Sequence, residues 1–72
     1  SLLNSKDAHI HEYKLEKSEF FHCLSGQWEI HCDGEKAIIS ERDTFSTPKN
    51  SIRSVRQIGD TDGSLFIVRQ TN

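Results

Sequence analysis

The sequence predicts an all-β protein, built as a small sandwich or barrel. Three observations lead to this prediction. Short runs of β-favouring residues alternate apolar with polar side chains, turn-forming residues separate the runs, and no stretch carries the apolar stripe of an amphipathic helix. Six or seven short strands with turns between them are typical of such folds.

The composition indicates one small, polar domain spanning residues 1–72. Hydrophobic residues make up 33% and charged residues 28% of the chain, and a chain this short buries only about 60% of its unfolded surface. We therefore expect a homodimer. The net charge of −2, with Lys and Arg scattered along the chain, argues against nucleic acid or a membrane as a partner. Without a bilayer-spanning apolar run or a signal peptide, the expected location is cytoplasmic.

The first quarter of the chain predicts a lead-in and one strand. Residues 1–7 show no periodicity and are predicted to form a lead-in arm. From residue 8 to residue 15 the sequence alternates, which places His9, His11, Tyr13 and Leu15 on one face of a strand. Because little precedes residue 8, we expect that a partner completes the sheet or that the chain is part of a longer one.

Residues 19–25 and 27–32 predict two strands joined at Ser25-Gly26, a pair typical of a two-residue hairpin. Pairing the strands across that turn gives them one common inner face, formed by Glu19, Phe21, Cys23, Trp28, Ile30 and Cys32. A single acidic residue thus lies on an otherwise apolar face. Phe20 and Leu24 point outward, where a dimer would cover them.

The second half of the chain predicts four more strands. Asp33-Gly34 favours a type I′ turn into a return strand at 35–40, and a short strand follows at 44–47. The triplet Pro48-Lys49-Asn50 indicates a turn into strand 51–58, with Arg53, Val55 and Gln57 on one face. A loop at 59–63 is predicted to close another hairpin. Strand 64–70 is the most continuous apolar run, so it is expected to be central in its sheet.

The two cysteines are expected to be reduced. In the predicted hairpin Cys23 lies opposite Trp28 and Cys32 lies opposite Glu19, an offset of about four residues. That offset exceeds the roughly 7 Å between Cα atoms that a disulfide allows.

The sequence resembles the cupin superfamily, whose fold is a small jelly-roll barrel. The resemblance covers roughly residues 9–70. Glu19, six further residues and Gly26 match the second half of the first cupin motif, and Asp43 and Pro48 match part of the second motif. The remaining family positions differ, because the second motif's glycine, histidine and asparagine are replaced by Asn50, Arg53 and Gln57.

The resemblance implies a metal site that this sequence does not complete. Cupin metal sites use three imidazoles and one carboxylate, a donor set suited to transition metals. Of those four positions Glu19 alone is retained, and a guanidinium such as that of Arg53 has no lone pair to donate. His9 and His11 have the spacing of the family's first histidine pair, although they lie further from Glu19 than the motif requires. No cofactor is therefore expected, and a divalent transition metal held by these two histidines and Glu19 is the alternative.

Glu19 and Arg53 are predicted to pair inside the barrel, where relatives keep a metal ion. An arginine fork fits a carboxylate, so the pair could be purely structural or could orient the acidic group of a small ligand. Tyr13 is predicted at the barrel mouth, and Phe21 and Trp28 either fill the core or contact that ligand. His22 and His31 are predicted on the outer face, where they could pair across the hairpin.

Two functions therefore stay open. The first is a protein that binds a small, acidic organic ligand through Glu19, Arg53, Tyr13, Phe21 and Trp28, without a complete metal site. The second is a metal-dependent cupin enzyme, such as a dioxygenase, isomerase or lyase, that uses His9, His11 and Glu19.

Overall fold

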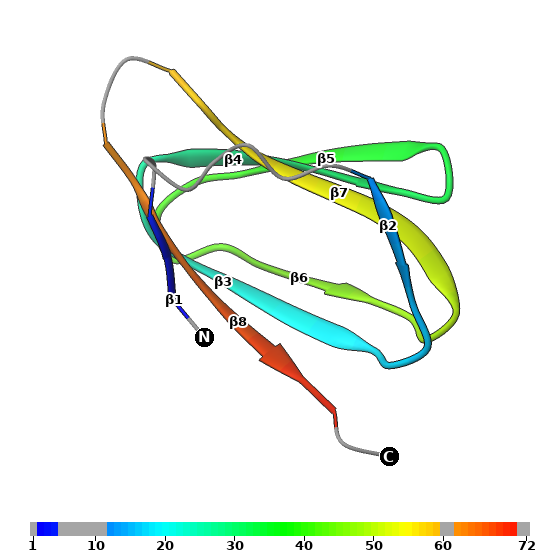
Figure 1. Ribbon diagram of the computed structural model, residues 1–72. Helices are drawn as coiled ribbons and strands as arrows, with labels where there is room; N and C mark the ends of the chain where they lie inside the picture. Colours follow the sequence, from blue (N-terminus) through cyan, green and yellow to red (C-terminus); the bar gives the residue numbers. More distant parts are fainter. Residues whose placement is uncertain (1, 5–11, 60–61, 71–72) are drawn as a thin grey trace.

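The computed structural model describes residues 2–4, 12–59 and 62–70, which form two antiparallel sheets of four strands each (Figure 1). The first sheet has the order β1-β8-β3-β6, and its strands are β1 (Leu2–Asn4), β8 (Ser64–Arg69), β3 (Glu19–Ser25) and β6 (Thr44–Thr47). The second has the order β2-β7-β4-β5, with β2 (Tyr13–Leu15), β7 (Ser51–Ile58), β4 (Gln27–Cys32) and β5 (Glu35–Ile39). The all-β jelly-roll prediction is confirmed. Within these residues no helix is long and apolar enough to cross a membrane.

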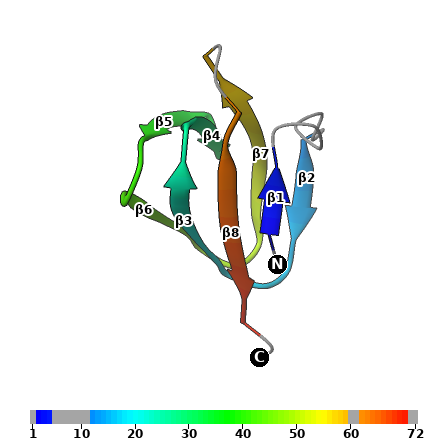
Figure 2. The same cartoon turned by 90° about the vertical axis from the view of Figure 1, so that its left-hand side faces the viewer.

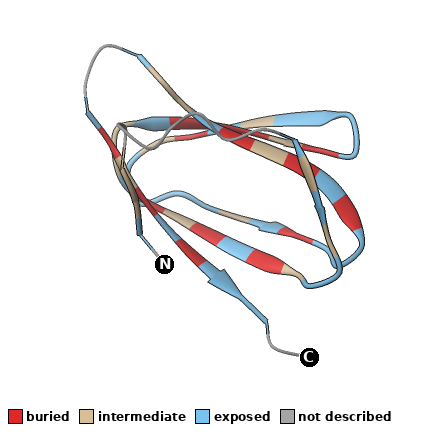
Figure 3. Cartoon of the chain, in the orientation of Figure 1, coloured by how far each residue is buried: buried red, intermediate tan, exposed pale blue. Residues whose placement is uncertain are grey.

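The two sheets face each other and enclose the core between them (Figure 3). Alternate residues of each strand point inward, as the pleat of a strand requires. The inner faces that the sequence predicted are confirmed for both β3 and β4. The buried core consists of Phe21, Cys23, Trp28, Ile30, Ile39, Val55, Leu65 and Ile67, with Leu3 and Phe45 packed against it.

The predicted hairpin at Ser25-Gly26 is wrong. Strand β3 pairs with β8 and β6, whereas β4 pairs with β5 and β7, so the chain passes at Gly26 from one sheet to the other. Gly26 has φ 76°, in the left-handed region that glycine enters without strain. Inward and outward positions are the same for a hairpin and for a crossing, so the alternation could not separate the two.

The loop before β8 is a second crossing, and the hairpin predicted there is also wrong. Strands β7 and β8 lie in different sheets. The two crossings meet closely, because a Cβ added at Gly63 would lie 2.8 Å from the carbonyl oxygen of Ser25. Strand β8 itself lies between β1 and β3, as Figure 2 shows, which confirms its predicted central place.

The hairpin predicted at Asp33-Gly34 is confirmed, because β4 turns there and pairs with β5. Both residues have positive φ, 49° and 86°, as the predicted type I′ turn requires. Asn50 also adopts the left-handed region, with φ 62°, in the turn predicted after Pro48. These local turn predictions are confirmed because each depends on the residues of the turn alone.

The N-terminal segment contains a strand that the sequence did not indicate. Residues 2–4 of the predicted lead-in form β1, which pairs with β8 and places Leu2 opposite Phe66. Of the strand predicted at 8–15, only residues 13–15 appear as β2, and residues 8–11, including His9 and His11, lie outside the described residues.

Candidate functional site

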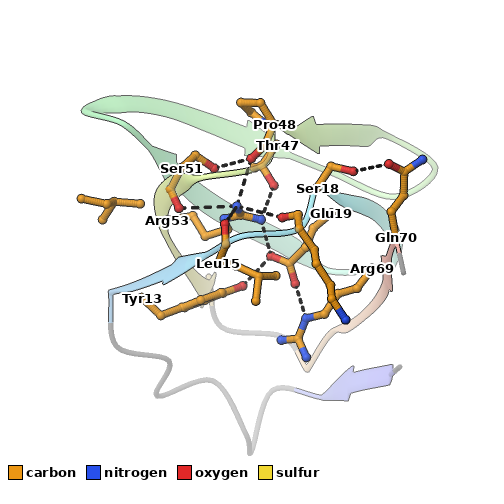
Figure 4. Close-up of polar contacts among 12 residues, drawn as sticks. Tyr13, Leu15, Ser18, Glu19, Thr47, Pro48, Ser51, Arg53, Arg69 and Gln70 are labelled. Atoms are coloured by element: carbon orange, nitrogen blue, oxygen red, sulfur yellow. Dashed lines mark hydrogen bonds and ion pairs between the residues drawn. The ribbon is translucent and has the colours of Figure 1, made fainter. Parts of the chain in front are cut away.

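Glu19 and Arg53 meet at one end of the core, as the sequence predicted (Figure 4). Glu19 opens β3 in the first sheet, and Arg53 projects inward from β7 in the second. The Nη1 atom of Arg53 donates to Oε1 of Glu19 at 2.9 Å, and neither side chain has any exposed surface. The pair therefore links the two facing sheets.

Arg53 also binds the two chain connections that cross between the sheets at this end. Its Nη1 donates to Thr47 Oγ1 at 2.8 Å. Its Nη2 lies 3.0–3.4 Å from four backbone carbonyls, those of Leu15, Lys17, Pro48 and Ser51. The links from β2 to β3 and from β6 to β7 supply two of these oxygens, those of Lys17 and Pro48, so one guanidinium joins both. Its Nε is a buried donor without an acceptor among the described residues.

Glu19 receives hydrogen bonds from three side chains. Besides Arg53, the hydroxyl of Tyr13 donates to Oε1 at 2.7 Å, and Nε of Arg69 donates to Oε2 at 2.7 Å. Burial by itself raises the pKa of Glu19. The hydrogen bonds from Tyr13, Arg69 and Arg53 outweigh burial, so the pKa of this carboxyl lies below its usual value and the group stays ionised.

Tyr13 is held in its neutral form. Burial, together with its hydrogen bond to the Glu19 carboxylate, raises the pKa of Tyr13 to about 12. The guanidinium carbon of Arg53 lies 5.9 Å from the centre of the Tyr13 ring, within the range of a cation–π contact. Tyr13 thus lies beside the Glu19–Arg53 pair, and its place at a barrel mouth stays a prediction.

Arg69 is the member of this cluster that the sequence analysis missed. Its side chain is 55% exposed, and its hydrogen bond to Glu19 raises its pKa above the usual arginine value. The register that opposes Arg69 to Glu19 exists only because β8 pairs with β3. The alternation that places Leu65 and Ile67 inward also places Arg69 inward, and that signal could have revealed it.

Phe21 and Trp28 are fully buried in the core. The indole Nε1 of Trp28 donates to the carbonyl of Ser25 at 3.2 Å, which leaves its polar atom satisfied inside the protein. Both side chains therefore act as core residues here, and their contact with a ligand stays a prediction.

The described residues do not fit the metal centre that the fold family implies. No group of three or more His, Cys, Asp or Glu side chains able to hold an ion occurs within residues 2–4, 12–59 and 62–70. Both oxygens of Glu19 already accept hydrogen bonds, and two of its three donors are cations that would repel a metal ion. His9 and His11, the imidazoles of the alternative, lie outside these residues.

The predicted pairing of His22 with His31 is wrong, because their strands belong to different sheets. His31 instead lies beside Glu29, with Nε2 2.6 Å from Oε1. Arg56 donates to both oxygens of Glu29, at 3.1 and 3.2 Å. These two partners, Arg56 first, lower the pKa of Glu29 to about 2.

Cys23 and Cys32 are free, as predicted, and both are buried. Burial is the main cause that raises the pKa of the Cys23 thiol, and the negative charge of Asp43 raises it further. A thiol held in its protonated form is a poor nucleophile.

Comparison with known proteins identifies a family model and several similar structures. The model described as "Cupin domain" matches residues 4–69. The chain superposes on the cupin domain of Cnp3 from Schizosaccharomyces pombe with a TM-score of 0.81 and 17% identity, covering 88% of this chain and 47% of that one. It superposes on TT1209 from Thermus thermophilus with a TM-score of 0.84 and 16% identity, covering 94% and 67%.

A third similar structure is that of KdgF from Halomonas sp., with a TM-score of 0.70 and 16% identity, covering 86% of this chain and 58% of that one. The chain thus spans between about half and two thirds of the length of these three proteins. Among curated proteins, no sequence matches it. At such low identities the structural likeness concerns the fold alone.

Proposed function

This chain belongs to the cupin family, and we propose that it binds a small acidic ligand at the barrel end where Glu19 lies between two arginines, without a metal ion in that site. The observation that carries this proposal is the charge of the cluster. One carboxylate, Glu19, pairs with two guanidinium groups, those of Arg53 and Arg69, and the neutral Tyr13 adds no charge. A surplus positive charge at the end of a barrel attracts an anion.

Arg69 is the group that would meet the ligand. Its side chain is 55% exposed, and of its three nitrogens Nε is the one that donates to Glu19. An arginine fork binds a carboxylate through paired hydrogen bonds, each strengthened by charge. Glu19 and Tyr13 would hold this fork in place, whereas Arg53, which has no exposed surface, would act through its charge.

The test is a titration with acetate, lactate, succinate and citrate, followed by NMR shifts and thermal stability, with chloride at matched ionic strength as a control. We expect saturable binding of at least one acid, weakened about tenfold or more in Arg69→Gln, since a charge-assisted hydrogen bond contributes about 1.5–3 kcal/mol. Arg56→Gln is the matched control, because Arg56 is a similarly exposed arginine, 63%, that pairs with Glu29 elsewhere. Failure of every acid to bind, or equal binding by Arg69→Gln, would overturn the proposal.

Metal content separates this proposal from the enzyme alternative. Protein purified without a metal-affinity tag should contain no stoichiometric iron, manganese, nickel or zinc. A stoichiometric metal that is lost in both Glu19→Ala and the double variant of His9 and His11 would favour the metal-dependent enzyme instead.

A further inference from the structure

A hollow of about 330 Å³ lies at the barrel end that holds the charged cluster. Two residues of that cluster, Glu19 and Thr47, line it. Neither exposes its side chain, so both contribute main-chain atoms to the hollow. The hollow is therefore the reverse side of the paired strands β3, β6 and β8, whose inner side carries the cluster.

The walls of the hollow are mainly apolar. Phe20 and Val68 lie opposite each other on β3 and β8, and both point outward with exposed side chains. Ser46, the partner of Phe20 on β6, adds one hydroxyl. Glu19 is the one charged residue among the described residues that line the hollow, and its carboxylate is enclosed on the other side of the sheet. Such a hollow accommodates an apolar group and disfavours a charged one.

Ser18 and Gln70 lie between the hollow and the cluster. Ser18 directly precedes Glu19, and Gln70 directly follows Arg69, so both lie where β3 begins and β8 ends. The Ser18 hydroxyl donates to Oε1 of Gln70 at 2.7 Å (Figure 4), and both residues line the hollow. Because these side chains are uncharged, a flexible apolar chain can cross this edge without breaking an ion pair.

We propose that the acid bound by this protein carries an alkyl tail, with its carboxylate on Arg69 and its tail in the hollow. The tail site rests on the proposed function, because Arg69 must hold the carboxylate. Val68 and Gln70, the chain neighbours of this exposed arginine, both line the hollow. The ligand class is thus a monocarboxylic acid with a flexible alkyl chain, such as hexanoate or octanoate. A second carboxylate in place of the tail would lie against apolar walls, which is unfavourable.

Titrations with acetate, butyrate, hexanoate and octanoate, followed by NMR, test the tail site. We expect the dissociation constant to fall along this series, by up to about fourfold for each methylene that enters the hollow. Octanoate should shift the methyl signals of Val68. Octanol has the tail without the carboxylate, so it should bind at least about tenfold more weakly than octanoate.

Phe20→Ser and Phe66→Ser form a matched pair of variants. The two rings are 43% and 42% exposed on the same face of the sheet, but Phe66 does not line the hollow. We expect Phe20→Ser to weaken octanoate binding about tenfold and to leave acetate binding unchanged, whereas Phe66→Ser should alter neither. Ser46→Phe should act as Phe20→Ser does, because a ring at this exposed position would fill the hollow. Circular dichroism of each variant checks the fold.

The outcomes separate the tail site from the carboxylate site. Failure of every acid to bind, acetate included, would overturn the proposed function and the tail site together. Acetate binding that does not tighten along the series would overturn the tail site alone. Octanoate binding that Phe66→Ser weakens as much as Phe20→Ser would also overturn the tail site and leave the proposed function standing.

Discussion

The guanidinium of Arg53 lies 2.9 Å from the carboxylate of Glu19, with both side chains fully enclosed between the sheets. Two charges removed from water are tolerated only where each is well paired and hydrogen-bonded. Here Arg53 also donates to Thr47 and to carbonyls of two crossing connections, those of Lys17 and Pro48. The pair therefore stabilises the end of the barrel at which those connections cross.

Removing one member of this pair should destabilise the protein strongly. Arg53→Met leaves the Glu19 carboxylate buried beside a neutral side chain and frees several carbonyls, and Glu19→Gln leaves two arginines without their anion. Breaking a buried pair costs about 3–5 kcal/mol. Urea melts of each variant measure the loss of unfolding free energy.

The matched control for that experiment is Arg56→Gln, which removes an exposed arginine that also pairs with a carboxylate. Exposed ion pairs contribute less to stability than buried ones, so this variant should lose less stability than Arg53→Met. If Arg53→Met cost less than about 1 kcal/mol, the buried pair would not stabilise the fold.

The titration of Tyr13 tests its contact with the Glu19 carboxylate. Tyr13 is the one tyrosine in the chain, so phenolate absorbance reports this residue alone. We expect a midpoint near pH 12 in place of the ordinary 10.0, and a lower midpoint in Glu19→Gln, because the carboxylate disfavours a second negative charge. Circular dichroism recorded in parallel shows whether the fold persists. A midpoint near 10 in folded protein would contradict the contact.

Acid should destabilise the fold through Glu29 and Glu19. Glu29 has a pKa of about 2 in the folded chain against an ordinary value of 4.5, and the pKa of Glu19 is also lowered. The folded state thus binds fewer protons than the unfolded state in this range. The stabilisation is complete above pH about 4.5 and is lost as the pH falls towards 2. Urea melts across this range should show a shallower pH dependence in Glu29→Gln, and an unchanged slope would refute the assignment.

The sequence predicted those features that depend on local residues and on alternation. The turn at Asp33-Gly34 and the positive φ of Asn50 follow from turn chemistry, and the inward position of Glu19 and Arg53 follows from the period of a strand. The contact between Glu19 and Arg53 could be predicted because the resemblance to cupins places both residues where relatives keep a metal ion.

Strand pairing could not be predicted in the same way. Glycine at position 26 suits a tight hairpin turn and also suits a crossing between sheets, and the inward residues are the same in both. The wrong pairing of β3 with β4 hid Arg69, because that residue reaches Glu19 only across the β3–β8 register. Pairing between distant segments depends on the whole fold, so one sequence does not determine it residue by residue.

Gly63 offers a test of the close approach between the two crossings. A Cβ at this position would lie 2.8 Å from the Ser25 carbonyl oxygen and 3.1 Å from Trp28 Nε1. Gly63→Ala should therefore cost about 1–3 kcal/mol through overpacking. Gly34→Asn is the control, since no atom lies within 4 Å of a Cβ there and asparagine tolerates the left-handed region. Chemical denaturation that ranks Gly34→Asn as the more damaging change would contradict this packing.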